Sequence, residues 1–175
     1  MLFQMLPNSN IEYKDPKYWN TRFSKEDSYE WLVGYKHVRD TIINNYMKNS
    51  SKSCKILQLG CGNSSFASDL YNDGFHDITN IDISSVCVEK MSSKYPHLKF
   101  LTMDMTAMSE ELSDNSFDVV LEKATLDALV VDCTNPWDFT CSSYSSIKRS
   151  LKEIKKVLKP SGLFISITFT QPHFR

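Results

Sequence analysis

The chain of 175 residues lacks the features that mark several large classes of protein. No apolar run approaches the 18 or more residues of a membrane span, so we expect no membrane association. The apolar start, residues 1–7, carries no basic residue and is not rich in arginine, so it predicts neither a secretory nor a mitochondrial signal. A net charge of −1 gives no indication of a nucleic-acid partner.

Cysteine is too sparse and too scattered to predict a zinc or a thioredoxin-like site. The five cysteines are odd in number, and no C-x-x-C pair occurs among them (Cys54, Cys61, Cys87, Cys133 and Cys141). We therefore expect no metal, reduced thiols and a cytoplasmic location. No Ser-His-Asp or Cys-His set falls where the predicted sheet would bring it together, so the sequence gives no indication of nucleophilic catalysis.

What the chain does contain is an alternation of strand and helix signals from Lys55 onward. Hydrophobic content of 41% and 23% charged residues are ordinary for one globular domain of this length. We expect strands at 56–59, 78–83, 98–102, 117–121 and 163–169. Between them we expect helices after Ser64 or Ser65, after Ser84, at 107–112 and at 144–158, with a turn at 160–162. This order predicts an α/β fold with a doubly wound, Rossmann-like parallel sheet covered by helices on both faces.

The region before the first strand, 1–50, is rich in aromatic residues and has a helical stripe over 35–47. Two interpretations are open for the aromatic cluster (Tyr18, Trp19, Phe23, Tyr29 and Trp31). In the first, the aromatic side chains belong to a pair of helices that pack on the sheet. In the second, they form a lid, because tryptophan can stack on a nucleobase or enclose a cation.

The most informative motif is Leu59-Gly60-Cys61-Gly62-Asn63-Ser64, which follows the first strand directly. Gly60 and Gly62 allow a sharp turn and a close approach of backbone to ligand. Asp82 ends the next strand about twenty residues later, where a carboxylate would face ribose hydroxyls. The strand, the glycine pair and the acid together predict a nucleotide-binding site.

The other strand ends carry further polar residues, Asp104-Met105 and Glu122-Lys123. Ligands of open α/β sheets bind at this edge, at the switch point between the first and fourth strands. Asp104 would accept a hydrogen bond from an adenine amino group while Met105 packs on the ring, although Asp104 is equally suited to cap a helix. For Lys123 the alternative interpretation is that its side chain only extends into solvent.

These residues resemble class I methyltransferases, which use S-adenosylmethionine. The run Leu121-Glu122-Lys123-Ala124-Thr125-Leu126-Asp127-Ala128 is similar to the eukaryotic branch that methylates lysine in elongation factor 1A. Four further segments also resemble that branch, namely Tyr18-Trp19, Tyr29-Glu30-Trp31, 59–64 and 172–175. The resemblance implies a protein-lysine methyltransferase with elongation factor 1A as its protein substrate.

By this resemblance, ten residues would bind S-adenosylmethionine. Trp19, Phe23 and Trp31 would close over it from the N-terminal segment. Gly60 and Lys123 would meet the methionine portion, Asp82 and Ile83 the ribose, and Asp104 and Met105 the adenine. Gly62 would contact the cofactor from the same turn as Gly60. The carboxylates considered for catalysis are Glu122 and Asp127, because a lysine acceptor must lose a proton. Asp127 could instead cap the helix that follows.

Two positions depart from the pattern of the resemblance. Gln58 stands where many class I enzymes have an acid. Ala124 stands where the branch usually has glycine, which implies a sterically tighter turn after the fourth strand.

We expect one methyltransferase domain over 1–175, with 1–50 as a helical lid segment and 51–175 as the cofactor-binding core. Class I enzymes continue past the fifth strand with a helix and a hairpin, and this chain stops at Arg175. The sequence therefore predicts cofactor binding more firmly than turnover. Three alternatives stay open: a truncated, non-catalytic binding module, a methyltransferase with another protein or small-molecule acceptor, and a nicotinamide-dependent oxidoreductase. The glycine motif of a nicotinamide-dependent oxidoreductase has a third glycine at the position where this chain has Ser65.

Overall fold

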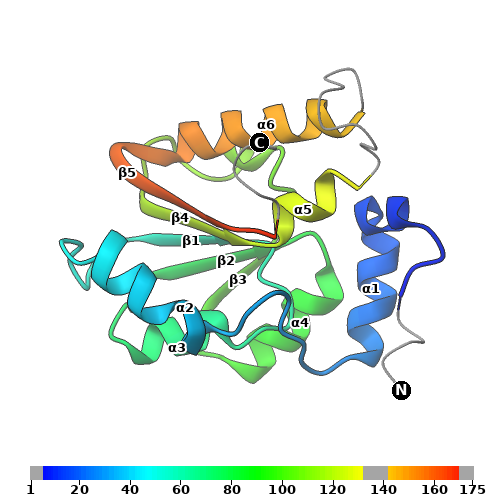
Figure 1. Ribbon diagram of the computed structural model, residues 1–175, viewed down its shortest axis with the longest axis horizontal. Coiled ribbons are helices and arrows are strands. Elements are labelled where there is room, and N and C mark those ends of the chain that lie inside the picture. The colour runs from blue at the N-terminus through cyan, green and yellow to red at the C-terminus, as the bar shows by residue number, and fades with distance from the viewer. Residues whose placement is uncertain (1–5, 132–141, 170–175) are drawn as a thin grey trace.

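The computed structural model describes residues 6–131 and 142–169. Its centre is a sheet of five parallel strands in the order β3-β2-β1-β4-β5 (Figure 1). The strands are β1 (Ile56–Leu59), β2 (Ile78–Asp82), β3 (Lys99–Thr102), β4 (Phe117–Lys123) and β5 (Leu158–Ile167). The direction of winding reverses between β1 and β4, which are hydrogen-bonded neighbours. This confirms the predicted doubly wound sheet and its switch point.

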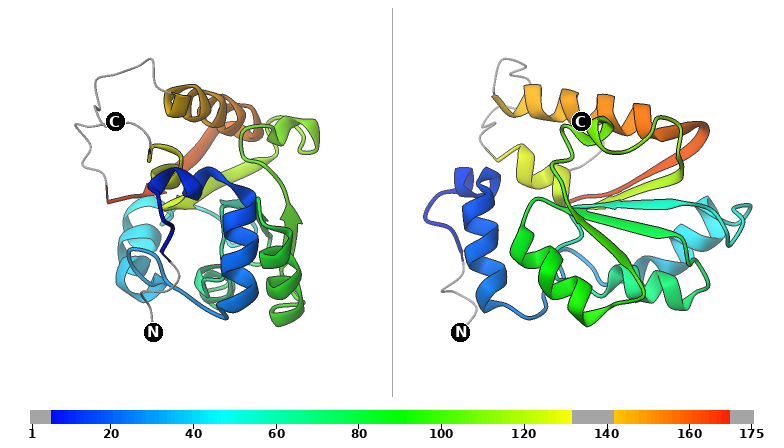
Figure 2. Two further views of the ribbon diagram at one scale, coloured as in Figure 1. Left: turned by 90° about the vertical axis from the view of Figure 1, so that its right-hand side faces the viewer. Right: turned by 180° about the vertical axis from the view of Figure 1, so that it is seen from behind.

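Helices cover both faces of the sheet (Figures 1 and 2). The helices that connect the strands are α3 (Phe66–Asn72), α4 (Ser85–Lys94), η4 (Met108–Glu110), α5 (Thr125–Leu129) and α6 (Ser142–Val157). The N-terminal part forms η2 (Asn10–Lys14), α1 (Pro16–Lys25), α2 (Tyr35–Asp40) and η3 (Thr41–Tyr46). Asp15 begins α1 by accepting a hydrogen bond from the Lys17 N–H, and Ser84 begins α4 by accepting one from the Cys87 N–H.

Two apolar cores lie on opposite sides of the sheet because successive side chains of a strand point to opposite faces. Ile56 packs with Phe66 and the other residues of one core, under α3 and α4. Its neighbour Leu57 packs with Val157 in the other core, under α6. All four residues of β1 are buried, as expected of a central parallel strand.

Three sequence predictions of element bounds are corrected. The fifth strand, expected at 163–169, runs from Leu158 to Ile167, and the expected turn at 160–162 lies within it as an irregularity. The pairing moves from Phe117–Leu158 to Val119–Leu163, so the turn residues bulge out of the ladder without ending the strand. The helix expected at 107–112 is only the short 3-10 helix η4. The stripe at 35–47 forms α2 followed by the π-helical segment η3.

The N-terminal helix α1 stands beside the carboxyl ends of the strands, where Figure 2 shows it in front of the sheet edge. It packs against α4. Within the described ranges, no helix combines the length and the apolar character that crossing a bilayer would need. The sequence motifs at Cys133, Cys141 and 172–175 lie outside the described residues.

Candidate functional site

The turn after β1 depends on glycine at two positions. Gly60 and Gly62 have φ angles of 57° and 54°, in the left-handed region that side chains disfavour. A Cβ atom on Gly60 would lie 2.9 Å from Cβ of Thr125 and closer still to the ends of that side chain. The turn therefore packs directly against the start of α5, and its bare backbone faces the space beyond the strand ends.

Asp82, the last residue of β2, joins this turn to the start of α4. One carboxylate oxygen accepts from the Gly62 N–H at 2.8 Å, and the other accepts from the Ser84 N–H at 2.9 Å. The side chain is buried, and this burial raises the pKa of Asp82. Its hydrogen bonds are to backbone N–H groups, which leaves lone pairs for further donors such as the hydroxyls of a diol.

A cavity of about 420 Å³ lies at this edge of the sheet. That volume is within the range of small-molecule sites. All ten residues predicted to bind the cofactor line it (Trp19, Phe23, Trp31, Gly60, Gly62, Asp82, Ile83, Asp104, Met105 and Lys123). Residues from the N-terminal helices, from the glycine turn and from three strand ends thus come together around one space.

Asp104 and Met105 form the part of the wall that follows β3. Asp104 is exposed and accepts a hydrogen bond from the Thr106 N–H at 2.8 Å. Because η4 begins only at Met108, this bond belongs to a turn, and the helix-cap interpretation of Asp104 is wrong. Met105 is buried and packs with the core under α6.

The aromatic cluster packs against the core and also lines the cavity. Phe23 is buried in the core and stacks on Trp19, with ring centroids 5.5 Å apart. Trp19 donates its indole N–H to the Tyr13 carbonyl at 2.7 Å and, like Trp31, is only partly buried. The rings of Tyr13, Trp19 and Trp31 lie 5.7–6.2 Å apart pairwise, and all three line the cavity.

Lys123 does not reach solvent, so that alternative is wrong. Its side chain is only 4% exposed, and its ammonium donates to the Trp31 carbonyl at 2.7 Å and to Glu30 at 3.2 Å. Burial lowers the pKa of Lys123 although Glu30 opposes the shift. Lys123 therefore lies in the cavity wall as a buried, hydrogen-bonded side chain.

The two carboxylates considered for catalysis are both engaged in structure. Glu122 is fully buried outside the cavity lining and accepts hydrogen bonds from the N–H groups of Thr125 and Leu126, at the start of α5. Asp127 does line the cavity, and it accepts from the Thr168 hydroxyl after β5. Ala124, between them, has a φ of 62°, the left-handed conformation that glycine adopts without strain.

Sequence reasoning missed several residues that shape the site. Tyr13 lines the cavity, and the signal for it was one more aromatic residue just before the predicted cluster. Glu30, Glu26 and Asn63 fix the walls through hydrogen bonds to residues 34 or more positions away. Local sequence pattern carries no signal for such long-range partners.

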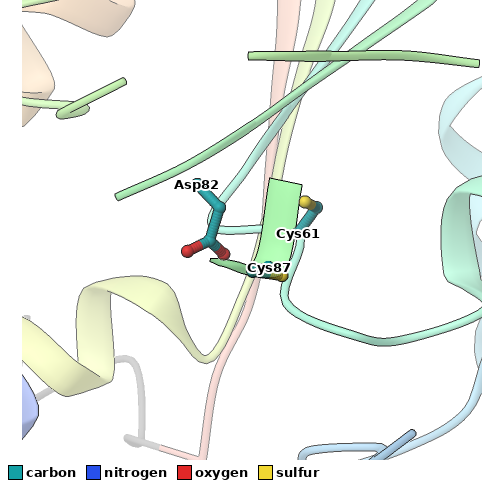
Figure 3. A group of neighbouring side chains, drawn as sticks. All are labelled: Cys61, Asp82 and Cys87. Carbon is teal, nitrogen blue, oxygen red and sulfur yellow. The ribbon is translucent and has the colours of Figure 1, made fainter. Parts of the chain in front are cut away.

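Below the glycine turn, Cys61, Asp82 and Cys87 lie close together (Figure 3). Their sulfur and carboxylate atoms lie within 4.8 Å of one another, and all three residues are buried. A hydrogen bond to Cys87 and burial raise the pKa of the Cys61 thiol. A metal ligand must be a thiolate, whereas the raised pKa of Cys61 favours a neutral thiol at that position.

Comparison with known proteins agrees with this geometry. The family described as "Methyltransferase domain" matches residues 50–173. The EEF1A lysine methyltransferase 4 of Bos taurus is 39% identical over 97% of this chain and 67% of its own length. The eEF1A lysine and N-terminal methyltransferase homolog of Drosophila melanogaster is also 39% identical over 97% of this chain, but over only 24% of its own.

Solved structures show the same fold at low sequence identity. A complex of the protein DhpI with SAM and HEP has a TM-score of 0.60 and 17% identity, covering 96% of this chain and 71% of that one. The sheet order, the cavity at its switch point and the sequence relatives all agree. The chain belongs to the methyltransferase domain family, has the class I methyltransferase fold, and resembles the eEF1A lysine methyltransferase branch.

Proposed function

We propose that the chain binds S-adenosylmethionine in the cavity and transfers its methyl group to a lysine of translation elongation factor 1A. The observation that carries the proposal is the position of Asp82 and the glycine turn on one cavity wall, in a member of the methyltransferase domain family. The acceptor is suggested by the relatives, which are named for lysine methylation of this factor. We also propose that 1–50 act as a lid on the core formed by 51–175.

The residues present fit the cofactor. Gly60 offers backbone without a side chain, and Asp82 is a buried carboxylate with acceptor capacity for ribose hydroxyls. Asp104 and Met105 would take the adenine, and Trp19 and Trp31 would cover the cofactor from the N-terminal side. When bound, S-adenosylmethionine supplies an electrophilic methyl group on a sulfonium.

The chain's own contribution is to align the acceptor amine and to keep water out. A lysine reaches the site as an ammonium and must lose its proton before it can act as a nucleophile. The lowered pKa of Lys123 supports the view that the cavity wall disfavours such a charge. The same desolvation would favour the neutral amine of the acceptor, whose proton would pass to bulk water as the lysine enters the site.

The aromatic wall supports an alkylammonium substrate. Tyr13, Trp19 and Trp31 are large rings on one side of the cavity, and rings of this kind attract cations over their faces. Such a wall would accept the apolar stem of a lysine as well as its head group.

The test is transfer of labelled methyl groups from S-adenosylmethionine to purified elongation factor 1A by the whole chain. We expect one labelled lysine, identified by mass spectrometry and lost when that lysine is changed to arginine. The control is the Asp82→Ala chain, which should label at least tenfold more slowly. A second reaction uses a cell lysate in place of the purified factor. If label then appears only on other proteins, the acceptor is one of those proteins and not elongation factor 1A. Cofactor binding without any labelling would instead favour the non-catalytic module.

A further inference from the structure

The segment between α1 and α2, residues 26–34, forms part of the cavity wall without regular secondary structure. It contributes Trp31 and Leu32 to the cavity lining. Leu32 has a φ of 63°, a left-handed conformation that is strained for a residue with a side chain. A strained, irregular segment keeps one conformation only when its surroundings hold it there, so its anchoring contacts decide where Trp31 lies.

Glu30 gathers donors from two other parts of the site. One oxygen accepts from the Ser64 hydroxyl at 2.7 Å and from the Ser65 N–H at 2.9 Å, at the end of the glycine turn where α3 begins. The other oxygen accepts from the Lys123 ammonium at 3.2 Å, at the end of β4. A single carboxylate thus joins the N-terminal segment, the glycine turn and β4.

Lys123 completes the connection to Trp31. Its ammonium donates to the Trp31 carbonyl at 2.7 Å while it contacts Glu30, the preceding residue. The Lys123 side chain is almost fully buried. Among the residues that the structure describes, Glu30 is the one carboxylate within ion-pair distance of its ammonium. Loss of Glu30 would therefore leave a buried positive charge without a counter-charge. The position of the Trp31 backbone therefore depends on the Glu30 carboxylate.

The indole of Trp31 is held separately, from its other side. The Arg22 guanidinium lies 4.8 Å from the Trp31 ring centroid and is fixed by two hydrogen bonds to Glu26. Asn63, in the glycine turn, donates to Glu26 and accepts from the Tyr29 N–H. These contacts would persist when Glu30 is changed, so the fold of the segment does not rest on Glu30 alone.

We infer that Glu30 is a positioning residue, which sets the place of Trp31 and of the glycine turn and through them the affinity for the cofactor. Glu30 is absent from the residues that line the cavity, so it acts without touching the ligand. The inference rests on the proposed function, because it assigns Glu30 to the cofactor cavity described above.

The test compares Glu30→Gln and Glu30→Ala with the unchanged chain, using S-adenosylhomocysteine as the probe in calorimetry. Glutamine keeps an oxygen for Ser64 but loses the charge that Lys123 meets, whereas alanine loses both contacts. We expect about fivefold weaker binding for Glu30→Gln and about twentyfold for Glu30→Ala. The matched control is Asp27→Asn, a carboxylate of the same segment that is exposed and pairs with Lys90. It should bind the probe like the unchanged chain.

A second readout separates positioning from a loss of stability. In a chain labelled with 5-fluorotryptophan, the fluorine resonance of Trp31 is assigned by its absence in Trp31→Phe. Glu30→Gln should shift or broaden that resonance while thermal unfolding stays close to that of the unchanged chain. If Glu30→Ala fails to fold, Glu30→Gln decides through the same two readouts, the affinity for S-adenosylhomocysteine and the Trp31 resonance.

Unchanged affinity and an unchanged Trp31 resonance in Glu30→Gln would overturn the positioning role. A failure of the proposed function looks different. In that case the unchanged chain itself would not bind S-adenosylhomocysteine, whereas a failure of the inference leaves that binding intact.

Discussion

Gly60 combines a left-handed backbone with a neighbour that fills the space of any side chain. The backbone angle alone would cost about 1 kcal/mol for an L-residue. The Thr125 side chain, whose hydroxyl donates to the Leu59 carbonyl at 3.0 Å, cannot move away without losing that bond. The turn is therefore shaped by contacts inside the protein as well as by its role as a ligand wall.

We expect Gly60→Ala to lower the free energy of unfolding by about 2–4 kcal/mol, because backbone strain and overlap with Thr125 add. Urea denaturation followed by circular dichroism measures this change. Gly34→Ala is the matched control, since a Cβ there would meet nothing closer than 3.9 Å. It should change stability by less than about 1 kcal/mol. Equal effects at the two positions would show that the Thr125 contact is not restrictive.

Asp82 should contribute to cofactor binding as well as to the shape of the glycine turn. We expect Asp82→Asn to weaken S-adenosylhomocysteine binding at least tenfold, because charge-assisted hydrogen bonds are worth about 1.5–3 kcal/mol each. Asparagine keeps one acceptor oxygen, so either the Gly62 N–H or the Ser84 N–H loses its partner, and we expect the free energy of unfolding to fall by about 1–3 kcal/mol with the chain still folded. Calorimetry measures the affinity, and unchanged affinity would remove Asp82 from the site.

At the scale of whole elements, α2 is tied to the end of α3 by one carboxylate. Asp73 accepts hydrogen bonds from the Tyr35 hydroxyl at 2.6 Å and from Arg39 at 2.7 Å. Arg39, then Tyr35, hold the pKa of Asp73 below its ordinary value of 3.8, against the effect of burial. The hydrogen bonds of Tyr35 and Arg39 to Asp73 join the N-terminal helices to the core on the side away from α6.

Asp73→Asn should lower the free energy of unfolding by about 1–2 kcal/mol at neutral pH. This value is kept low because Arg39 is half-exposed, and solvent weakens its ion pair with Asp73. Because the folded pKa is lowered, this contribution is complete above pH 3.8 and disappears as pH falls through the folded value. The difference between the two chains should therefore shrink in acid. Asp40→Asn, which removes an exposed carboxylate bound to the same arginine, should have little effect at any pH.

The proposed lid role predicts different behaviour for substitutions at Trp31 and at Phe23. Trp31→Ala should weaken S-adenosylhomocysteine binding at least tenfold and cost less stability than Phe23→Ala. The buried Phe23 should show the loss of about 3–5 kcal/mol that is typical of a truncated core aromatic. Calorimetry and urea denaturation of the two variants measure both quantities. A larger stability loss for Trp31→Ala would make Trp31 a core residue.

For the whole molecule, local sequence pattern predicted the sheet and the cavity edge well. Buried runs such as Ile56–Leu59, and the glycine turn that follows, are local signals, so strand order and site position could be inferred. Pro160 and Gly162 misled the prediction of β5 because a bulge can absorb turn residues within a strand. Glu30 was missed because its partner Lys123 lies 93 positions away.

Protection of backbone amides against hydrogen exchange should differ between the central sheet and the N-terminal segment. We expect the slowest exchange in β1 and β4, which lie in the interior of the sheet, and faster exchange in residues 26–34. Adding S-adenosylhomocysteine should slow exchange in 26–34 at least tenfold and leave the exposed segment 48–53 unchanged. Mass spectrometry of peptides measures this. Equal slowing across the chain would contradict a lid that closes locally.

The pairing of β1 with β4 also fixes the order in which a growing chain can fold. During synthesis the N-terminal segment emerges first, yet the ammonium that fixes Trp31 comes 92 residues later. Until β4 has left the ribosome, β1 has a partner on one side only, and the aromatic residues of α1 have no cavity to line. The segment around Trp31 thus reaches its final place only after β4 has been made, and a chaperone that shields apolar side chains would act there until then.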